Sequence, residues 1–416
     1  IKELWGIDFF WIAAIGLVVL TALYTIFGGM KSVLYTSVLQ TPILLLGSLI
    51  ILVLGFKELG GWDEMMRVCG AVTVNDYGDT MTNLIRSNDD ANFPWLGALI
   101  GSAIIGFWYW CTDQFIVQRV LSGKNEMEAR RGTIFGAYLK LLPVFLFLIP
   151  GMIAFALHQK YIGAGGEGFL PMLANGTANA DAAFPTLVAK LLPAGVKGLV
   201  VCGILAALMS SLASLFNSSA MLFTIDFYKR FKPETPEKKL VGIGQIATIV
   251  IVVLGILWIP IMRSVGDVLY TYLQDVQSVL APGIAAAFLL GICWKRTSAQ
   301  GGMWGLISGM VIGLTRLGAK VYYSNAGEVA DSTFKYLFYD MNWLFFCGWM
   351  FLFCIIVVIV VSLATEAPTA EKIQGLVFGT ATKKQKAATR ASWNHWDIIH
   401  TVIILAITAA FYWYFW

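Results

Sequence analysis

The sequence predicts an all-α protein that crosses a membrane many times. Hydrophobic residues make up 58% of its 416 residues and charged residues only 13%, with a mean hydropathy of +0.73. Soluble domains carry roughly 25% charged residues. The apolar residues also fall into long runs, and about 20 such residues suffice for one spanning helix. Together these observations exclude a soluble protein built around one large core.

The apolar runs predict ten transmembrane helices in this chain. The fifth run is longer than a bilayer requires, so we expect it to tilt or to protrude. In chain order the runs are about 9–27, 35–56, 94–117, 132–157, 196–228, 240–262, 268–294, 301–319, 343–364 and 398–416.

The loops between these runs predict an orientation. Taken alternately, one set of loops holds 17 Lys and Arg residues and the opposite set holds nine. Cytoplasmic loops carry the excess of Lys and Arg, so both ends of this chain are predicted outside. The basic segment "KKQKAATR" (383–390) is interpreted as a solvated cytoplasmic loop rather than as a switch that binds lipid or a partner.

The third run contains the stretch "IGFWYWCTDQFIV" (105–117), here called the aromatic box. Successive helical residues point about 100° apart, so Trp108, Tyr109 and Trp110 cannot all face one cavity. Trp and Tyr also gather at membrane interfaces, and Asp113 and Gln114 near a helix end suit that position. The alternative is a ligand site, because an aromatic face stacks on the apolar face of a sugar-like ring. Residue types alone leave both interpretations open.

The fourth run carries a lysine, Lys140, in "GAYLKLLPVFLFLIPG". It lies about eight residues into the run, or roughly 12 Å from the helix start. A lysine side chain can reach back part of that distance towards water. An inward-facing polar role and such snorkelling are equally compatible with the sequence.

The fifth run contains "GILAALMSSLASLFNSSAMLF" (203–223), which places small and polar residues on one helical face. This small-residue stripe could pack closely against another helix. The hydroxyls of Ser210 and Ser211, with nearby backbone carbonyls, could instead hold a small hard cation, which prefers oxygen ligands. The members of the stripe are Gly203, Ala207, Ser210, Ser214 and Asn217.

The seventh run contains "YTYLQDVQSVLAPG" (270–283). Gln274 and Gln277 are three residues apart and share a face, where an amide could bind ligand hydroxyls or a neighbouring helix. Pro282 within the run frees a carbonyl and predicts a kink.

The residues that most intramembrane enzymes or metal sites require are missing from the pattern. The six cysteines form no CxxC pair, and the three histidines have neither metal nor triad spacing. We therefore do not expect an enzyme.

Five long motifs resemble the solute:sodium symporter family, and within it the sodium/glucose and bacterial sodium/galactose cotransporters. The motifs are "ALYTIFGGMKSVLYTSVLQT" (22–41), "WYWCTDQFIVQRVLSGKN" (108–125), "GAYLKLLPVFLFLIPGMIA" (136–154), "AALMSSLASLFNSSAMLFTIDFY" (206–228) and "APGIAAAFLLGICWKR" (281–296). The resemblance implies a leucine-transporter-type inverted-repeat fold with about fourteen helices in the full protein. Residues 1–56 would then end the first repeat, 94–294 would form the second repeat, and 301–416 would be peripheral helices of a single, N-terminally incomplete domain.

The resemblance also implies roles for individual residues. Tyr109 matches the aromatic residue that stacks on the sugar, and Trp110 matches its neighbour beneath the sugar. Lys140 and Gln274 match polar sugar contacts, and Tyr270 matches an outer-gate aromatic. The sodium ion would be bound by the Ala207 carbonyl, Ser210 and Ser211.

Two positions depart from the family pattern. Gly106 stands where sugar-binding relatives carry a side chain that forms hydrogen bonds. Ser37 stands where the family usually has Asp, which helps to form a second sodium site in some members. A neutral hydroxyl cannot supply that charge, so we expect one sodium ion per sugar.

The leading hypothesis is a symporter that couples sodium influx to uptake of galactose or glucose in a bacterial inner membrane. Its expected partners are the sugar, sodium ion (Na+) and the lipid bilayer, with no nucleic acid. The alternatives are a sodium symporter for myo-inositol, sialic acid or an amino acid, and a sensor that binds sugar without transporting it.

Overall fold

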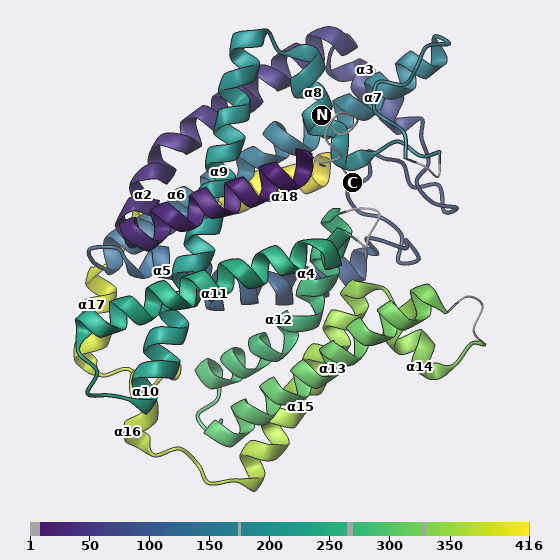
Figure 1. Ribbon diagram of the computed structural model, residues 1–416. Coiled ribbons are helices and arrows are strands. Elements are labelled where there is room, and N and C mark those ends of the chain that lie inside the picture. Colours follow the sequence, from purple (N-terminus) through teal and green to yellow (C-terminus); the bar gives the residue numbers. More distant parts are fainter. Residues whose placement is uncertain (1–8, 174–175, 264–268, 327–329, 416) are drawn as a thin grey trace. The chain divides into compact units, whose positions relative to one another are not determined.

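The computed structural model describes residues 9–173, 176–263, 269–326 and 330–415. Within these ranges the regular structure is helical, apart from three isolated β-bridges (Figure 1). The chain divides into two compact units. The first unit contains residues 1–69 and 142–265, and the second contains 70–141 and 266–416.

The first unit is built around α2 (Phe9–Leu59) and α9 (Ala194–Met221), which pack against each other. Ala22, Phe216 and Val252 form a buried cluster among α2, α9 and α11, so the apolar faces of three long helices meet there. The other elements are α3 (Trp62–Gly70), η2 (Val144–Leu148), α7 (Ile149–Gly163), η3 (Ala180–Ala182), α8 (Ala183–Leu191), η4 (Leu222–Tyr228), α10 (Lys229–Phe231) and α11 (Glu237–Arg263).

The second unit is centred on α12 (Leu269–Cys293), α13 (Ala299–Asn325) and α15 (Trp343–Ala364), which lie side by side (Figure 1). A Cβ atom added to Gly309 would lie 3.0 Å from the Gly283 Cα atom. These glycines therefore let α12 and α13 approach closely, as small residues do between membrane helices. The other elements are α4 (Trp95–Phe107), η1 (Trp108–Thr112), α5 (Gln114–Leu121), α6 (Glu126–Pro143), α14 (Thr333–Lys335), η5 (Tyr336–Asp340), α16 (Ala370–Ile373), α17 (Lys383–Ala391) and α18 (His395–Tyr414).

Eight helical stretches of the described residues are long and apolar enough to cross a membrane. They correspond to eight of the ten predicted spans, all but the first and the eighth, and they confirm a multi-pass membrane protein. The stretches are Thr41–Leu59, Trp95–Thr112, Glu126–Gly163, Ala194–Phe231, Glu237–Ile259, Leu273–Cys293, Trp343–Ala364 and His395–Tyr414.

The two remaining predicted spans fall short of the length or the hydropathy that a membrane-crossing helix needs. The first, 9–27, contains only the shorter apolar helix Trp11–Ile26. The eighth, 301–319, lies in the 27-residue helix α13 but does not reach the same hydropathy. Six glycines and Arg316 in that segment explain the difference, because none of them adds to hydropathy as a leucine or valine would.

The turn predicted between the first two spans is replaced by continuous helix. Residues 9–59 form one helix of 51 residues, and Gly28, Gly29 and Lys31 lie within it. Glycine in a helix costs only about 1 kcal/mol relative to alanine, and the segment between the two apolar stretches contains no proline. Such a helix is about 76 Å long at ~1.5 Å per residue, more than twice the bilayer core of ~30 Å. Of the described residues of α2, the stretch Thr41–Leu59 is the one that is long and apolar enough to cross a membrane.

Side-chain caps fix where α5, α13, α15 and α18 of the second unit begin. Asp113, Ser298, Asn342 and Asn394 each accept a hydrogen bond from a backbone N–H in the first turn of the following helix. These are residue types favoured at helix N-termini, because their oxygens satisfy donors that have no partner within the helix. The third predicted span, 94–117, is divided at such a cap: α4 and η1 end before Asp113, and α5 starts after it.

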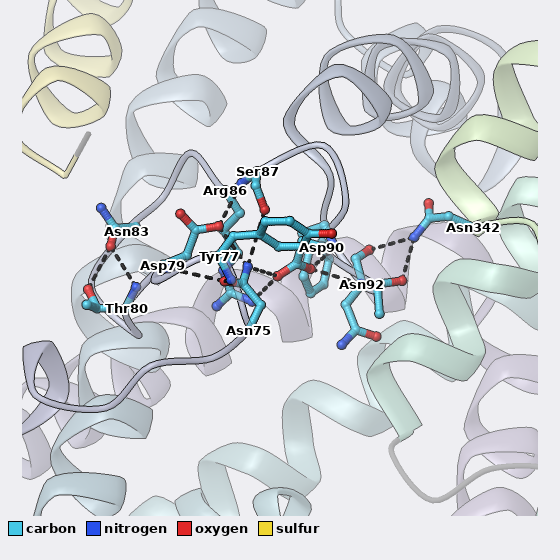
Figure 2. A network of polar contacts seen from close by, with 12 residues as sticks. Asn75, Tyr77, Asp79, Thr80, Asn83, Arg86, Ser87, Asp90, Asn92 and Asn342 are labelled. Carbon is cyan, nitrogen blue, oxygen red and sulfur yellow. Dashed lines mark hydrogen bonds and ion pairs between the residues drawn. The ribbon is translucent and has the colours of Figure 1, made fainter.

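A polar network organises the loop that precedes α4 (Figure 2). The Asn75 amide donates to the carboxylates of Asp79 at 2.7 Å and Asp90 at 3.3 Å. The backbone N–H of Ser87 also donates to Asp79, at 2.7 Å. Asn342 at the start of α15 donates to the Ala91 carbonyl at 2.7 Å. The loop is therefore held to the helices of the second unit by directional contacts.

Candidate functional site

The central residues of the aromatic box form a π-helix, η1, which follows α4 directly. The Asp113 N–H donates to the Trp108 carbonyl five residues earlier at 3.1 Å, and the Thr112 hydroxyl donates to the same carbonyl at 2.8 Å. Short π-helical segments are rare and occur frequently at functional sites. The wider turn changes the direction of each aromatic side chain from that in an α-helix.

The three consecutive aromatic residues have different surroundings. Trp108 packs against a buried cluster formed by residues of α4, α12 and α15. The Tyr109 and Trp110 rings meet edge to face, with centroids 5.0 Å apart. Tyr109 is half-buried and Trp110 is exposed. Trp108 therefore contributes to packing, whereas the other two rings form a pair that is partly open.

Lys140 of α6 lies beside this aromatic pair. Its Nζ atom is 5.0 Å from the centroid of the Trp110 ring, a cation–π distance. Among the described residues, no carboxylate or hydrogen-bond acceptor contacts this ammonium group. The structure thus brings together three of the predicted solute-binding residues, Tyr109, Trp110 and Lys140, and in the described ranges the ammonium group has no carboxylate partner.

The two predicted residues of α12 lie one helical turn apart. Tyr270 is exposed near the start of the helix, and Gln274 is half-buried. In the part of the chain that the structure describes, the Gln274 amide makes no hydrogen bond. Residues four apart share a helical face, and η1 packs against α12. The second unit therefore carries all five predicted solute-binding residues.

Gly106 lies just before η1 and borders open space. A Cβ atom added there would meet no heavy atom within 4 Å. The first atom of the side chain that the family resemblance leads us to expect at this position therefore has room.

The small-residue stripe of α9 has a different environment, because it packs against α2. A Cβ atom added to Gly203 would lie 3.1 Å from a methyl group of Ile43. Ser214 is fully buried, and its hydroxyl donates to the Ser210 carbonyl at 3.0 Å in its own helix. Close helix packing accounts for these members of the stripe.

The two adjacent serines predicted to bind sodium lie on different sides of α9. Ser210 is buried within the first unit, whereas Ser211 is exposed and Ala207 is half-buried. The Tyr24 hydroxyl of α2 donates to the Met209 carbonyl at 2.7 Å, just before the serine pair. This hydrogen bond fixes the local position of α9 on α2 and leaves Ser211 accessible. The Ser37 side chain lies outside the described residues.

A buried ion-pair cluster was not predicted from the sequence. Asp275 of α12 pairs with Arg316 at 3.5 Å and with Lys320 at 2.5 Å, both from α13. The side chain of Arg316 is fully buried, donates to the Met341 carbonyl at 2.8 Å, and lies 4.1 Å from the centroid of the Phe346 ring. Charges of opposite sign within predicted spans were the available signal, because intramembrane charges usually pair.

Comparison with known proteins assigns the chain to a family. The sequence model of the sodium:solute symporter family matches residues 1–309. The chain belongs to the sodium:solute symporter family. It is 34% identical to the sodium/mannose cotransporter of Bos taurus over 98% of this chain and 72% of that protein. It is also 35% identical to sodium/myo-inositol cotransporter 2 of Homo sapiens and 37% identical to sodium/glucose cotransporter 1 of Ovis aries.

The match covers most of this chain but only part of these longer relatives. It includes 89% of the chain and 56% of the myo-inositol cotransporter, and 87% of the chain and 57% of the glucose cotransporter. The chain thus spans just over half the length of those two relatives.

A solved structure confirms the predicted fold class. The substrate-bound, outward-open state of a Na+-coupled sialic acid symporter superimposes with a TM-score of 0.63 at 20% identity, over 89% of this chain and 70% of that one. The chain therefore has the leucine-transporter-type helical fold of a sodium-coupled symporter. Sodium as the coupling ion is likewise confirmed at the level of the family.

Proposed function

We propose that the protein is a secondary active symporter that couples sodium influx to uptake of a sugar, such as galactose or glucose. The observation that carries the proposal is the group of Tyr109, Trp110 and Lys140 beside α12. An aromatic face with nearby polar groups suits a ring that has apolar C–H faces and a rim of hydroxyls. The names of the relatives, which are mannose, myo-inositol and glucose cotransporters, support this class of solute.

Each residue has a distinct role in this proposal. The Tyr109 ring stacks on the sugar, and Trp110 supports it from below. The Gln274 amide can donate to one hydroxyl and accept from another. Lys140 donates to hydroxyl oxygens, and Tyr270 covers the site from the outer side. These polar groups are available because protein partners do not occupy them among the described residues.

The proposed driving ion is a single sodium ion bound by the Ala207 carbonyl, Ser210 and Ser211. Moving one positive charge through 100 mV releases about 2.3 kcal/mol, which corresponds to roughly fifty-fold accumulation. The ratio of one rests on Ser37, which offers no negative charge for a second ion. A reversal-potential measurement on reconstituted protein tests it, and a ratio of two sodium ions per sugar contradicts the argument from Ser37.

The proposed arrangement assigns residues 1–56 to the end of the first repeat and 94–294 to the second, with 301–416 as peripheral helices. Both ends of this chain would face outside in a bacterial inner membrane, which requires α2 to be interrupted so that its two apolar stretches cross the bilayer separately. Labelling of cysteines introduced at Lys384 and at Tyr77 from either side of intact cells tests the orientation. The proposal requires access to position 384 from the cytoplasm and to position 77 from outside.

Uptake into proteoliposomes tests the function directly. We expect an inward sodium gradient to drive accumulation of labelled galactose or glucose, and a potassium gradient of equal size to drive none. The Tyr109→Ala variant should lose this uptake while the protein remains folded. Sodium-independent equilibration of sugar, or binding without transport, would rule out symport and favour a channel or a sensor.

A second candidate solute follows from the ammonium group of Lys140, which has no carboxylate partner in the described ranges. Such a group could pair with the carboxylate of an anionic sugar such as sialic acid. Competition of labelled sugar uptake by galactose, glucose, myo-inositol and sialic acid separates these solutes. For a neutral sugar, Lys140→Gln should weaken affinity about fivefold, the value of one hydrogen bond. For an anionic solute, the same change should abolish uptake.

A further inference from the structure

The segment between α15 and α18 is held at one end of the candidate spans of the second unit. It begins after Ala364, where one candidate span ends, and stops before His395, where another begins. In its middle, the Phe378 N–H donates to the Ile292 carbonyl in the last turn of α12 at 2.7 Å. The segment is therefore connected to the ends of three candidate spans, and we expect a bilayer surface at the ends of such spans.

A tight turn in this segment presents two large apolar side chains outwards. Gly375 and Gly379 adopt φ angles of 77° and 82°, which favour glycine. Between them, Val377 is buried, whereas Leu376 is 73% exposed and Phe378 is 82% exposed. Both exposed residues lie outside the candidate spans, so a spanning role does not explain their exposure. Water is an unfavourable environment for a paired Leu and Phe at a turn.

The neighbouring helix α17 carries four positive charges: Lys383, Lys384, Lys386 and Arg390. Within the described residues, no carboxylate lies in ion-pair contact with any of them. All three lysines lie within the first four residues of the helix, where the helix dipole is also positive. The charges therefore repel one another and the helix end, unless an anion outside the protein compensates them.

A cavity of about 440 Å³ lies between the turn and α17. Its walls are the turn at residues 375–379, together with Ile292, Lys386, Thr389, Arg390 and Trp393. The Arg390 guanidinium lies 4.4 Å from the centroid of the Trp393 ring. The lining offers two cations, a hydroxyl and apolar surface, and it contains no carboxylate.

We propose that this cavity binds the phosphate of an anionic phospholipid from the surrounding bilayer, with Leu376 and Phe378 inserted among the acyl chains. Lys386, Arg390 and the Thr389 hydroxyl are the phosphate-binding groups. Charge complementarity selects an anionic headgroup, because basic clusters beside a membrane are attracted to anionic lipid. The exposed Leu376 and Phe378 select a lipid over a soluble phosphate. The segment is then a membrane-surface element rather than the solvated loop expected from its sequence. The site is independent of the transported solute.

Native mass spectrometry of the full chain in detergent, with phosphatidylglycerol or phosphatidylcholine added, tests the site. We expect the wild type to retain phosphatidylglycerol preferentially. Replacing Lys383, Lys384, Lys386 and Arg390 by Gln should lower that retention at least about tenfold. The matched control replaces four other cations by Gln, Lys229 and Arg230 of α10 and Lys238 and Lys239 of α11, and should change retention less than about twofold.

Two further measurements keep the test decisive if the quadruple variant does not fold. In the wild type, added salt should reduce the preference for phosphatidylglycerol, because screening weakens surface charge attraction. Leu376→Ser combined with Phe378→Ser should weaken retention of both lipids. Equal retention of the two lipids by the wild type, or an equal loss in the control variant, overturns the proposal. Complete displacement by soluble glycerol phosphate overturns it in favour of a soluble ligand.

Discussion

The polar side chains around η1 and those along α9 are satisfied in different ways. Around η1, among the residues that the structure describes, the Lys140 ammonium group lies beside an aromatic ring without an acceptor, and the Gln274 amide of neighbouring α12 makes no hydrogen bond. Along α9, Ser214 bonds its own helix, and Gly203 is in close contact with Ile43 of α2. Polar groups in a membrane protein either find protein partners or remain available for a ligand, and the two regions illustrate these outcomes.

This difference predicts which substitutions should reduce stability and which should reduce solute binding. Where the protein already satisfies a polar group, its removal should reduce stability. Where the group has no protein partner, its removal should reduce binding and leave stability unchanged. Both properties can be measured on the same purified variants.

The largest expected effect is at Asp275, whose carboxylate forms ion pairs with two cations. Asp275→Ala leaves the buried Arg316 without its carboxylate, and breaking such a pair costs about 3–5 kcal/mol of stability. Thermal unfolding in detergent measures it. Asp275→Leu with Arg316→Met should recover most of the loss, because the pair is replaced by apolar groups. Lys320→Gln is the matched control and should cost little, since Lys320 is partly exposed. Unchanged stability of Asp275→Ala would contradict the importance of the cluster.

The next effect concerns Tyr109, which has no hydrogen-bond partner among the described residues. Tyr109→Ala removes the stacking face and should weaken solute binding by roughly ten- to a hundredfold. Tyr109→Phe keeps that face and should be milder. Trp108→Leu should instead lower the unfolding temperature with little change in affinity, because Trp108 packs against the buried cluster. Isothermal titration and melting of each variant give both values. If Trp108→Leu abolished binding and Tyr109→Ala spared it, the assigned faces would be wrong.

A smaller effect is expected at the two serines of α9 that differ in exposure. Ser211→Ala removes an exposed hydroxyl and should raise the sodium concentration for half-maximal uptake severalfold, as loss of one ligand would. Ser214→Ala is the matched control, since that hydroxyl is already bonded within α9. Uptake as a function of sodium concentration separates them. An identical sodium dependence for Ser211→Ala and the wild type removes Ser211 from the proposed site.

These contrasts also show which features the sequence could predict. Runs of apolar residues located eight spans, because hydropathy depends only on composition along the chain. The break at Asp113 could be expected from a polar residue near a helix end, but the π-helix of η1 depends on competition for the Trp108 carbonyl. The faces of Ser210 and Ser211 depend on where α2 packs, and the long-range pairs of Asp275 depend on which helices are neighbours. None of these is encoded in local periodicity.

In the loop that precedes α4, which lies outside the candidate spans, the polar side chains bind one another through hydrogen bonds and ion pairs (Figure 2). Hydrogen bonding from the Asn75 side chain, and then from Ser87, holds the pKa of Asp79 below its usual range. Burial alone would raise the pKa of Asp90, but the backbone donors at Phe93 and Asn92, the nearby charge of Arg86 and the Asn75 amide together lower it.

Because both pKa values are depressed, the charged carboxylates stabilise the fold above the ordinary carboxyl pKa of about 4, and this contribution is lost as pH falls below it. The unfolding temperature should therefore drop between neutral and acid pH. The drop should be smaller in Asn75→Ala, which lacks a shared donor. An unchanged pH profile in that variant would exclude these hydrogen bonds as the cause.

The smallest expected effect comes from two glycines that differ in the space around them. Gly106 borders open space beside η1, whereas a Cβ atom added to Gly203 would lie 3.1 Å from a methyl group of Ile43. Gly106→Ser should add a hydroxyl near the proposed solute site without strain, and one new hydrogen bond would improve affinity about fivefold. Gly203→Ser should force α2 and α9 apart at a cost of about 1–3 kcal/mol, with no gain in affinity. Melting curves and solute titrations of the two variants decide the matter. A Gly106→Ser variant that loses stability, or a Gly203→Ser variant that binds solute more tightly, would contradict the comparison. It would show that the presence of protein partners does not distinguish the region around η1 from α9.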